Sequence, residues 1–175
     1  MQQAPVEIAT ALVSQTRRLL RDEYLPRIER CLAQLSEQQI WWRPNEESNS
    51  IGNLTLHLAG NARQWILCGL GGAADQRQRD REFSQREELP GAELIRRLTE
   101  TLSEVDRVLA QLDLSQMLSV REIQGLEVTT LEAVLHVTEH FSMHTGQIIL
   151  LTKLLTGRDL HFYDFDGGVP IKRWK

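Results

Sequence analysis

The sequence predicts an all-α protein: a four-helix bundle with a small β-hairpin before its last helix and an irregular C-terminal tail. Three observations support this prediction. Apolar residues recur at helical spacing in four long segments, turn formers separate these segments, and helix-start signals precede several of them. The chain has 175 residues, enough to bury a sizeable core. We therefore expect a single domain over residues 1–175.

The first predicted helix covers residues 6–35, where leucines and isoleucines recur at helical spacing. Pro26 lies inside this pattern and should kink the helix near residues 24–25, because proline lacks a backbone donor and its ring crowds the preceding turn. Residues 36–39 fit a capping box and predict a short helical turn. Residues 43–50 are rich in turn formers and predict a loop.

The second predicted helix covers residues 51–70 and ends at the glycine pair 71–72. Residues 73–88 are polar and without period, so they predict a long loop. A third helix is predicted over residues 90–112, with proline in its first turn.

The pattern changes over residues 118–129, where two short alternating runs around a glycine-containing turn predict a hairpin. Residues 129–132 form a second capping box, and the fourth helix should follow over residues 131–155. Gly157 is a natural stop for it. Residues 158–175 read as an irregular aromatic tail.

The charge balance excludes several classes of partner. The net charge is −4, and no concentrated block of lysine and arginine is present. Nucleic-acid binding depends on such blocks, so we expect no nucleic-acid partner. The sequence contains no signal-peptide pattern and no apolar run of the ~18 residues that a membrane span needs. We therefore expect a cytoplasmic protein without a membrane partner.

Three histidines, His136, His140 and His144, recur at four-residue intervals in the fourth predicted helix. Residues four apart share one face of a helix, so two imidazoles there can bind one metal ion. His136 and His144 are roughly 12 Å apart along the axis, too far for a single ion. The spacing allows His136 with His140, or His140 with His144, and does not choose between them. A solvated face is the alternative, but the surrounding residues are apolar, and buried histidines need partners.

His57 is the expected third ligand, because it lies in an amphipathic segment of the second predicted helix. Asn53, Asn61 and Trp65 share its face at four-residue steps. Such a partly polar stripe inside a bundle indicates a lined pocket. A lone histidine in this position is more often simply hydrogen-bonded, and the second group of histidines is what favours a metal site.

Two segments also carry a family resemblance: residues 49–61, SIGNLTLHLAGN after Asn49, and residues 136–148, HVTEHFSMHTGQI. Together with the Trp-Arg-Pro run at residues 42–44, they resemble the DinB/YfiT-like superfamily, in particular its uncharacterised bacterial branch. The resemblance covers most of the chain. It implies a four-helix bundle, usually a homodimer, with a metal held by three histidines.

The resemblance assigns the ligands residue by residue. The histidine of the second helix is His57, and the pair that precedes the Thr-Gly-Gln-Ile run is His140 and His144. His136 then becomes a neighbour of the site. Around the ligands we expect a pocket wall or supporting layer whose members are His136, Asn61, Gln147 and Asn53.

The resemblance also implies an activity, because characterised members include metal-dependent transferases that use low-molecular-weight thiols. We expect one divalent transition metal ion, zinc or nickel first, with iron, manganese and copper as alternatives. The expected function is a thiol-dependent S-transferase acting on small electrophiles. The alternatives are a hydrolase that uses metal-bound water and a non-enzymatic, metal-stabilised structural or interaction protein. No catalytic residue can be named from the sequence.

Overall fold

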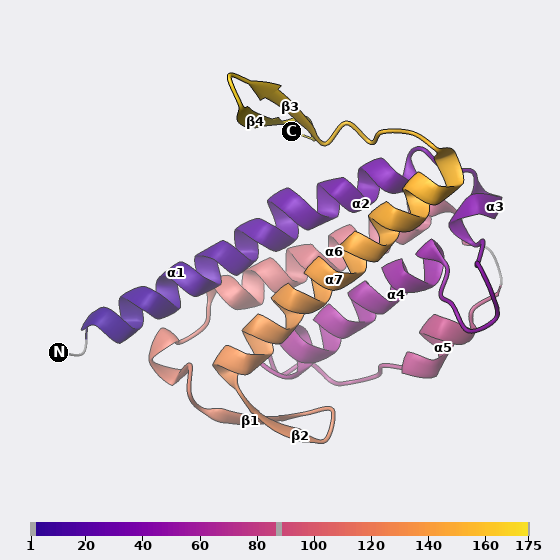
Figure 1. Ribbon diagram of the computed structural model, residues 1–175. Coiled ribbons are helices and arrows are strands. Elements are labelled where there is room, and N and C mark those ends of the chain that lie inside the picture. The colour runs from indigo at the N-terminus through magenta and orange to yellow at the C-terminus, as the bar shows by residue number, and fades with distance from the viewer. Residues whose placement is uncertain (1–2, 87–88, 175) are drawn as a thin grey trace.

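A computed structural model describes residues 3–86 and 89–174 and is mostly helical, with two small antiparallel hairpins (Figure 1). The helical elements are α1 Gln3–Leu19, a π-helical segment Leu20–Tyr24, α2 Leu25–Leu32, α3 Glu37–Ile40, α4 Ile51–Ala62, a π-helical segment Arg63–Cys68, α5 Arg79–Ser84, α6 Gly91–Ala110, a 3₁₀ turn Leu114–Gln116 and α7 Thr130–Thr156. The strands are β1 Val120–Ile123, β2 Leu126–Thr129, β3 Tyr163–Asp166 and β4 Val169–Lys172.

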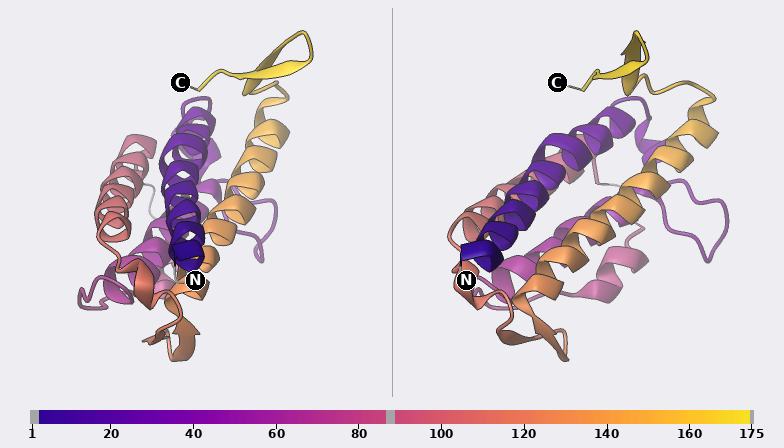
Figure 2. Two further views of the ribbon diagram at one scale, coloured as in Figure 1. Left: turned by 90° about the vertical axis from the view of Figure 1, so that its left-hand side faces the viewer. Right: turned by 60° about the vertical axis from the view of Figure 1, so that its left-hand side comes forward.

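The long helices lie side by side in all three views (Figures 1 and 2). α4 packs against both α6 and α7, and α1 and α2 pack against α7. The apolar stripes of these helices meet in one core. Its largest fully buried side chains include Phe141, Ile28, Ile51, Leu58, Ile66, Leu98 and Ile148. Burying one such side chain contributes roughly 1.5–3 kcal/mol. Within the described residues, no helix combines the length and the apolar character needed to cross a membrane.

The first predicted helix is interrupted where Pro26 was expected to disturb it. The backbone widens into the π-helical segment Leu20–Tyr24 and returns to α-helix at Leu25. Proline has no N–H to donate to the carbonyl four residues earlier, which is that of Asp22. The indole of Trp174 donates to this carbonyl oxygen instead, over 2.9 Å. The kink thus provides an attachment point for the end of the chain.

The loop expected over residues 73–88 is wrong in part, because Arg79–Ser84 forms the short helix α5. Residues 87–88 lie outside the described residues. No side chain caps α5 at its first residue, so the local sequence gives little signal for it. Its stability comes from tertiary contact instead: the side-chain amide of Asn53 donates to the Glu82 carbonyl over 2.7 Å.

The hairpin and capping signals before the fourth helix are confirmed. β1 pairs with β2 in antiparallel register, and the turn between them places Gln124 and Gly125 at φ 58° and 75°. Two consecutive residues at positive φ match the twist of a two-residue hairpin. Thr129 and Glu132 then form a reciprocal capping box, and α7 ends at Gly157 with φ 64°. Both ends of α7 are therefore fixed by local chemistry.

The irregular tail expected after Gly157 is wrong, because β3 and β4 form a second antiparallel hairpin. Gly167 and Gly168 make its turn at φ 56° and 83°, which glycine adopts without steric cost. The hairpin is tied to α2 and the π-helical segment before it: Arg27 donates to the Tyr163 hydroxyl over 2.6 Å, and Lys172 pairs with Glu23. The glycine pair indicates a turn in the sequence. No local pattern indicates the long-range contacts of the hairpin with Arg27 and Glu23.

Replacing the cap of α7 should weaken the whole fold, because α7 packs against α1, α2 and α4. We expect Thr129→Ala to lower the free energy of unfolding by about 1 kcal/mol. Urea denaturation measures this change. Ser142→Ala, an exposed substitution in the middle of the same helix, is the matched control and should change stability by less than about 0.5 kcal/mol. Equal stability of the two variants would contradict a structural role for the capping box.

Candidate metal centre

The packing of α4 against α7 brings three histidines together. His57 comes from α4, and His140 and His144 come from successive turns of α7. One ring nitrogen of each lies within 4.8 Å of the other two, and Nε2 of His57 is 3.1 Å from Nε2 of His140. Two nitrogen ligands of one tetrahedral ion, bound at ~2.0–2.1 Å, are roughly 3.4 Å apart. The spacing of these nitrogens therefore suits a metal ion.

Burial keeps the imidazoles of α7 neutral. His144 is 9% exposed, and burial lowers its pKa despite the opposing hydrogen bond to Gln147. Burial also lowers the pKa of His140 to about 3, and the neighbouring His144 and His57 add to this effect. A neutral imidazole has one nitrogen lone pair available, which is the form that binds metals.

Two of the three rings are oriented by a hydrogen bond at their other nitrogen. Nδ1 of His57 lies 2.9 Å from Oε2 of Glu82, and Nδ1 of His144 lies 2.7 Å from Oε1 of Gln147. A carboxylate or amide oxygen only accepts, so each Nδ1 donates and each Nε2 keeps its lone pair. Outer hydrogen bonds of this kind fix the tautomer and orientation of metal-binding histidines.

Glu82 is held in place by Arg77. The Arg77 guanidinium donates to both carboxylate oxygens of Glu82, each over 2.8 Å, and to Oε1 of Gln64 over 2.8 Å. Burial acts to raise the pKa of Glu82, but the hydrogen bonds from Arg77 and His57 outweigh it and lower that pKa. The carboxylate is therefore ionised near neutral pH, and it accepts a hydrogen bond from Nδ1 of His57.

A glycine allows Glu82 to approach α4 closely. A Cβ at Gly60 would collide with Oε1 of Glu82 and would lie 3.1 Å from Nε of Arg77. Glycine in the interior of a helix costs ~1 kcal/mol relative to alanine. At this position, the absence of a side chain makes room for the ion pair beside His57.

His136 lies next to the three histidines but in a different environment. Its ring stacks on the indole of Trp65, with centroids 3.8 Å apart and planes inclined by 24°. Nδ2 of Asn61 donates to its Nε2 over 3.1 Å. Burial lowers the pKa of His136, so this ring is also neutral near pH 7. Its Nε2 lone pair is engaged by Asn61.

Asn53 lies at the start of α4 and connects elements rather than facing the histidines. Its side chain forms a capping box with Ser50, and its amide nitrogen bonds the Glu82 carbonyl of α5. Arg43 donates to its oxygen over 2.5 Å. Asn53 therefore helps to hold α5, and with it Glu82, against α4.

A cavity of about 280 Å³ lies beside the histidines. Its lining residues come from α4, α5 with the segment before it, the β1–β2 turn and α7: His57, Asn61, Arg77, Arg79, Gln124, His136 and His140. Gln147, which the sequence places near the site, is absent from this lining and instead supports His144. The cavity borders two of the three clustered histidines, His57 and His140.

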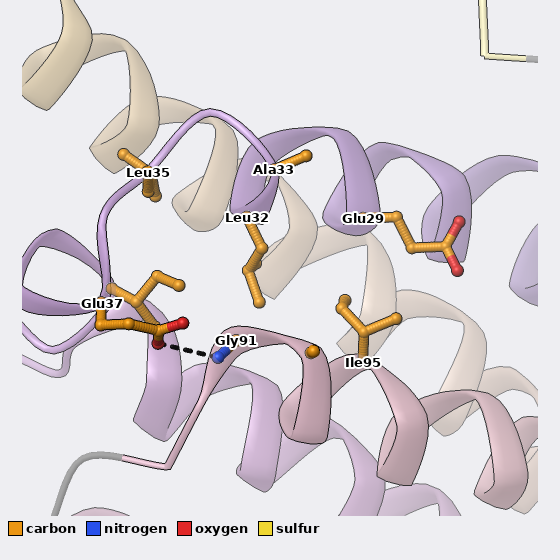
Figure 3. A pocket seen from close by; sticks show the side chains of 9 residues that line it. Glu29, Leu32, Ala33, Leu35, Glu37, Gly91 and Ile95 are labelled. Carbon is orange, nitrogen blue, oxygen red and sulfur yellow. Dashed lines mark hydrogen bonds between the residues drawn. The ribbon is translucent and has the colours of Figure 1, made fainter.

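A larger hollow, about 420 Å³, opens between α2, α3 and the start of α6 (Figure 3). Leu32 and Ile95 give it an apolar wall, and the Glu37 carboxylate accepts a hydrogen bond from the Gly91 backbone over 2.8 Å. Its lining includes no histidine or cysteine. This hollow therefore offers no imidazole or thiolate ligand for a metal ion.

Sequence reasoning missed four residues of this site: Glu82, Arg77, Arg79 and Gln124. The first three lie in the segment expected to be a structureless loop. One signal for them was readable: a polar stretch with alternating charges, between two long helices, can lie over a pocket. Nothing in the local sequence indicates that Glu82 reaches His57.

The chain matches the model of a known protein family, and no curated protein matches the chain. The match is to the family described as "Protein of unknown function (DUF1572)", and it extends over residues 7–165. The matched region includes the three clustered histidines, the neighbouring His136 and the α5 segment. The chain therefore belongs to the DUF1572 family.

Proposed function

We propose that the protein is a DinB-like four-helix metalloenzyme in which His57, His140 and His144 bind one divalent transition metal ion. The observation that carries this proposal is the convergence of three ring nitrogens, within 4.8 Å of one another, from two helices. The outer hydrogen bonds that His57 donates to Glu82 and His144 donates to Gln147 support it, because a histidine that serves only packing has no need of an oriented lone pair.

An open catalytic site suits this arrangement better than a closed structural one. Structural zinc sites normally have four protein ligands. Among the described residues, the group contains three, and no further histidine, cysteine or carboxylate joins it. The adjacent cavity reaches His57 and His140. A coordination position on that side is therefore left for a small molecule.

The reaction class that we propose is S-transfer from a low-molecular-weight thiol to a small electrophile. A bound divalent ion would hold the thiol as its thiolate near neutral pH. Zinc and nickel are the metals that we favour, since both bind imidazole well. The choice of a thiol rests on the family resemblance carried by residues 49–61 and 136–148. The cavity beside the histidines has room for a small electrophile.

The residues of the chain prepare the site in three ways. Glu82 holds the proton of His57 at Nδ1, and Gln147 does the same for His144, so both rings keep their orientation. Burial keeps the imidazoles of His140 and His144 neutral. The described lining includes no aspartate or glutamate, and both oxygens of the neighbouring Glu82 already accept hydrogen bonds from Arg77 and His57, so we expect no carboxylate base that would activate water. This composition favours transfer over hydrolysis.

Removing a ligand should remove the metal. We expect near-stoichiometric metal in the untagged wild type and in His136→Ala, and a large loss in His57→Ala, His140→Ala and His144→Ala. Inductively coupled plasma mass spectrometry measures the content. His136→Ala is the matched control, because its ring lies beside the cluster but is engaged by Asn61 and Trp65. Loss of metal from His136→Ala with retention in His144→Ala would place the ion one turn earlier on α7.

Displacing Glu82 without touching a ligand should weaken metal binding. We expect Gly60→Ala to lower metal affinity by about 10–100-fold, because the new methyl group pushes the Glu82 carboxylate away from His57. A competition titration with a chromophoric chelator measures the affinity. Gly146→Ala is the matched control: it lies inside α7, its Cβ would meet nothing within 4 Å, and its metal affinity should equal that of the wild type. Equal metal affinities of the two variants would contradict a role for Glu82 in metal binding.

Turnover should require a thiol. We expect metal-loaded protein to consume small electrophiles, such as an alkyl halide or an epoxide, only when a low-molecular-weight thiol is added, and His140→Ala to be inactive. Mass spectrometry of the thioether product measures this. Turnover of ester or amide substrates without thiol would instead support the hydrolase alternative. The absence of both activities in metal-loaded protein would support a structural or interaction role.

A further inference from the structure

Two arginines line the histidine cavity, and among the described residues only Arg77 forms an ion pair. Arg77 is neutralised by its paired hydrogen bonds to Glu82, and the side chains of these two residues are only 5% and 11% exposed. Arg79 also lines the cavity. Within residues 3–86 and 89–174, no carboxylate lies within ion-pair distance of Arg79. The positive charge of Arg79 is therefore not balanced by a carboxylate of the described residues.

Arg79 is held beside the histidines by aromatic contacts. Its guanidinium lies 4.9 Å from the centroid of the Phe83 ring, and that ring lies 4.5 Å from the ring of His57. A guanidinium over an aromatic face keeps its edge free for hydrogen bonds. The guanidinium of Arg79 carries five N–H groups beside the cavity, and no side chain among the described residues accepts a hydrogen bond from them.

A second unsatisfied group lies deeper. Asn61 is 4% exposed and lines the same cavity. Its Nδ2 donates to His136, while its Oδ1 is buried and has no hydrogen-bond partner among the described residues. A buried acceptor without a partner is costly, and such groups usually point to a missing ligand or water. Among the described residues, the cavity therefore offers a guanidinium without a carboxylate partner and a buried amide oxygen without a donor.

We propose that this cavity binds a small carboxylate that carries a hydroxyl or amino group on the next carbon. Arg79 pairs with the carboxylate, and Oδ1 of Asn61 accepts the hydrogen bond of the hydroxyl or amine. Paired hydrogen bonds between a guanidinium and a carboxylate are both strong and directional. About 280 Å³ accommodates a molecule of this size. The inference rests on the proposed function for the choice of this cavity as the substrate site.

Titrations with glycolate, acetate and acetamide test the proposal, because these probes differ in charge and in the hydroxyl group. We would record ¹H–¹⁵N spectra of the full chain, both metal-free and zinc-loaded, and follow the side-chain amides of Asn61 and Gln124. Arg79→Gln is the test variant. Arg81→Gln removes the same charge from the same helix, at an exposed position outside the cavity lining, and is the matched control.

We expect glycolate to bind more tightly than acetate, and acetate more tightly than acetamide, in both forms of the protein. Arg79→Gln should weaken the binding of acetate and glycolate by about fivefold to tenfold and leave the binding of acetamide unchanged, since only a charged probe pairs with the guanidinium. Arg81→Gln should match the wild type. Asn61→Ala should reduce the preference for glycolate over acetate.

Equal binding of acetate and acetamide, or equal effects of Arg79→Gln and Arg81→Gln, would overturn the inference even if zinc binds as proposed. A chain that retains no metal yet shows the Arg79-dependent preference in its metal-free form would support the inference and contradict the proposed function. The two failures are therefore distinguishable in one set of spectra.

Discussion

The contact between α4 and α7 is the constraint on which the rest of the site depends. It places His57 opposite His140 and His144, with two Nε2 atoms 3.1 Å apart. The apolar residues around this contact supply the free energy that holds the three imidazole rings together. Their burial lowers the pKa of His140 and His144, so the packing that positions the nitrogens also keeps their lone pairs available.

A second layer of charges supports this cluster from outside. Arg77 and Glu82 form a nearly buried ion pair, and Glu82 uses its remaining capacity to accept from His57. A buried ion pair is rarely a gain in stability by itself, because desolvation offsets the attraction. Its value here is orientation. Glu82 lies in α5, which the side chain of Asn53 holds against α4. Gly60 leaves room for the Glu82 carboxylate. The position of this short helix therefore affects the geometry of the candidate metal centre.

The sequence predicts what local chemistry controls. The long helices and the capping box at Thr129 follow from periodicity and side-chain caps, and the structure has them. The helix at residues 79–84 lacks such signals, because residues far away in the chain hold it, among them Asn53, whose side chain donates to the Glu82 carbonyl. The hairpin turn at residues 167–168 was readable from its glycines. The approach of Glu82 to His57 was not, because it depends on how two helices and a loop meet in space.

The central claim is an open metal centre with three histidine ligands. X-ray absorption at the zinc edge of the zinc-loaded chain tests it most directly, because scattering from imidazole rings counts the histidines around the ion. The account predicts three imidazoles and one light, non-protein ligand that exchanges when a small thiol is added. Four protein ligands, unchanged by any added thiol, would mean a closed structural site and would contradict the account.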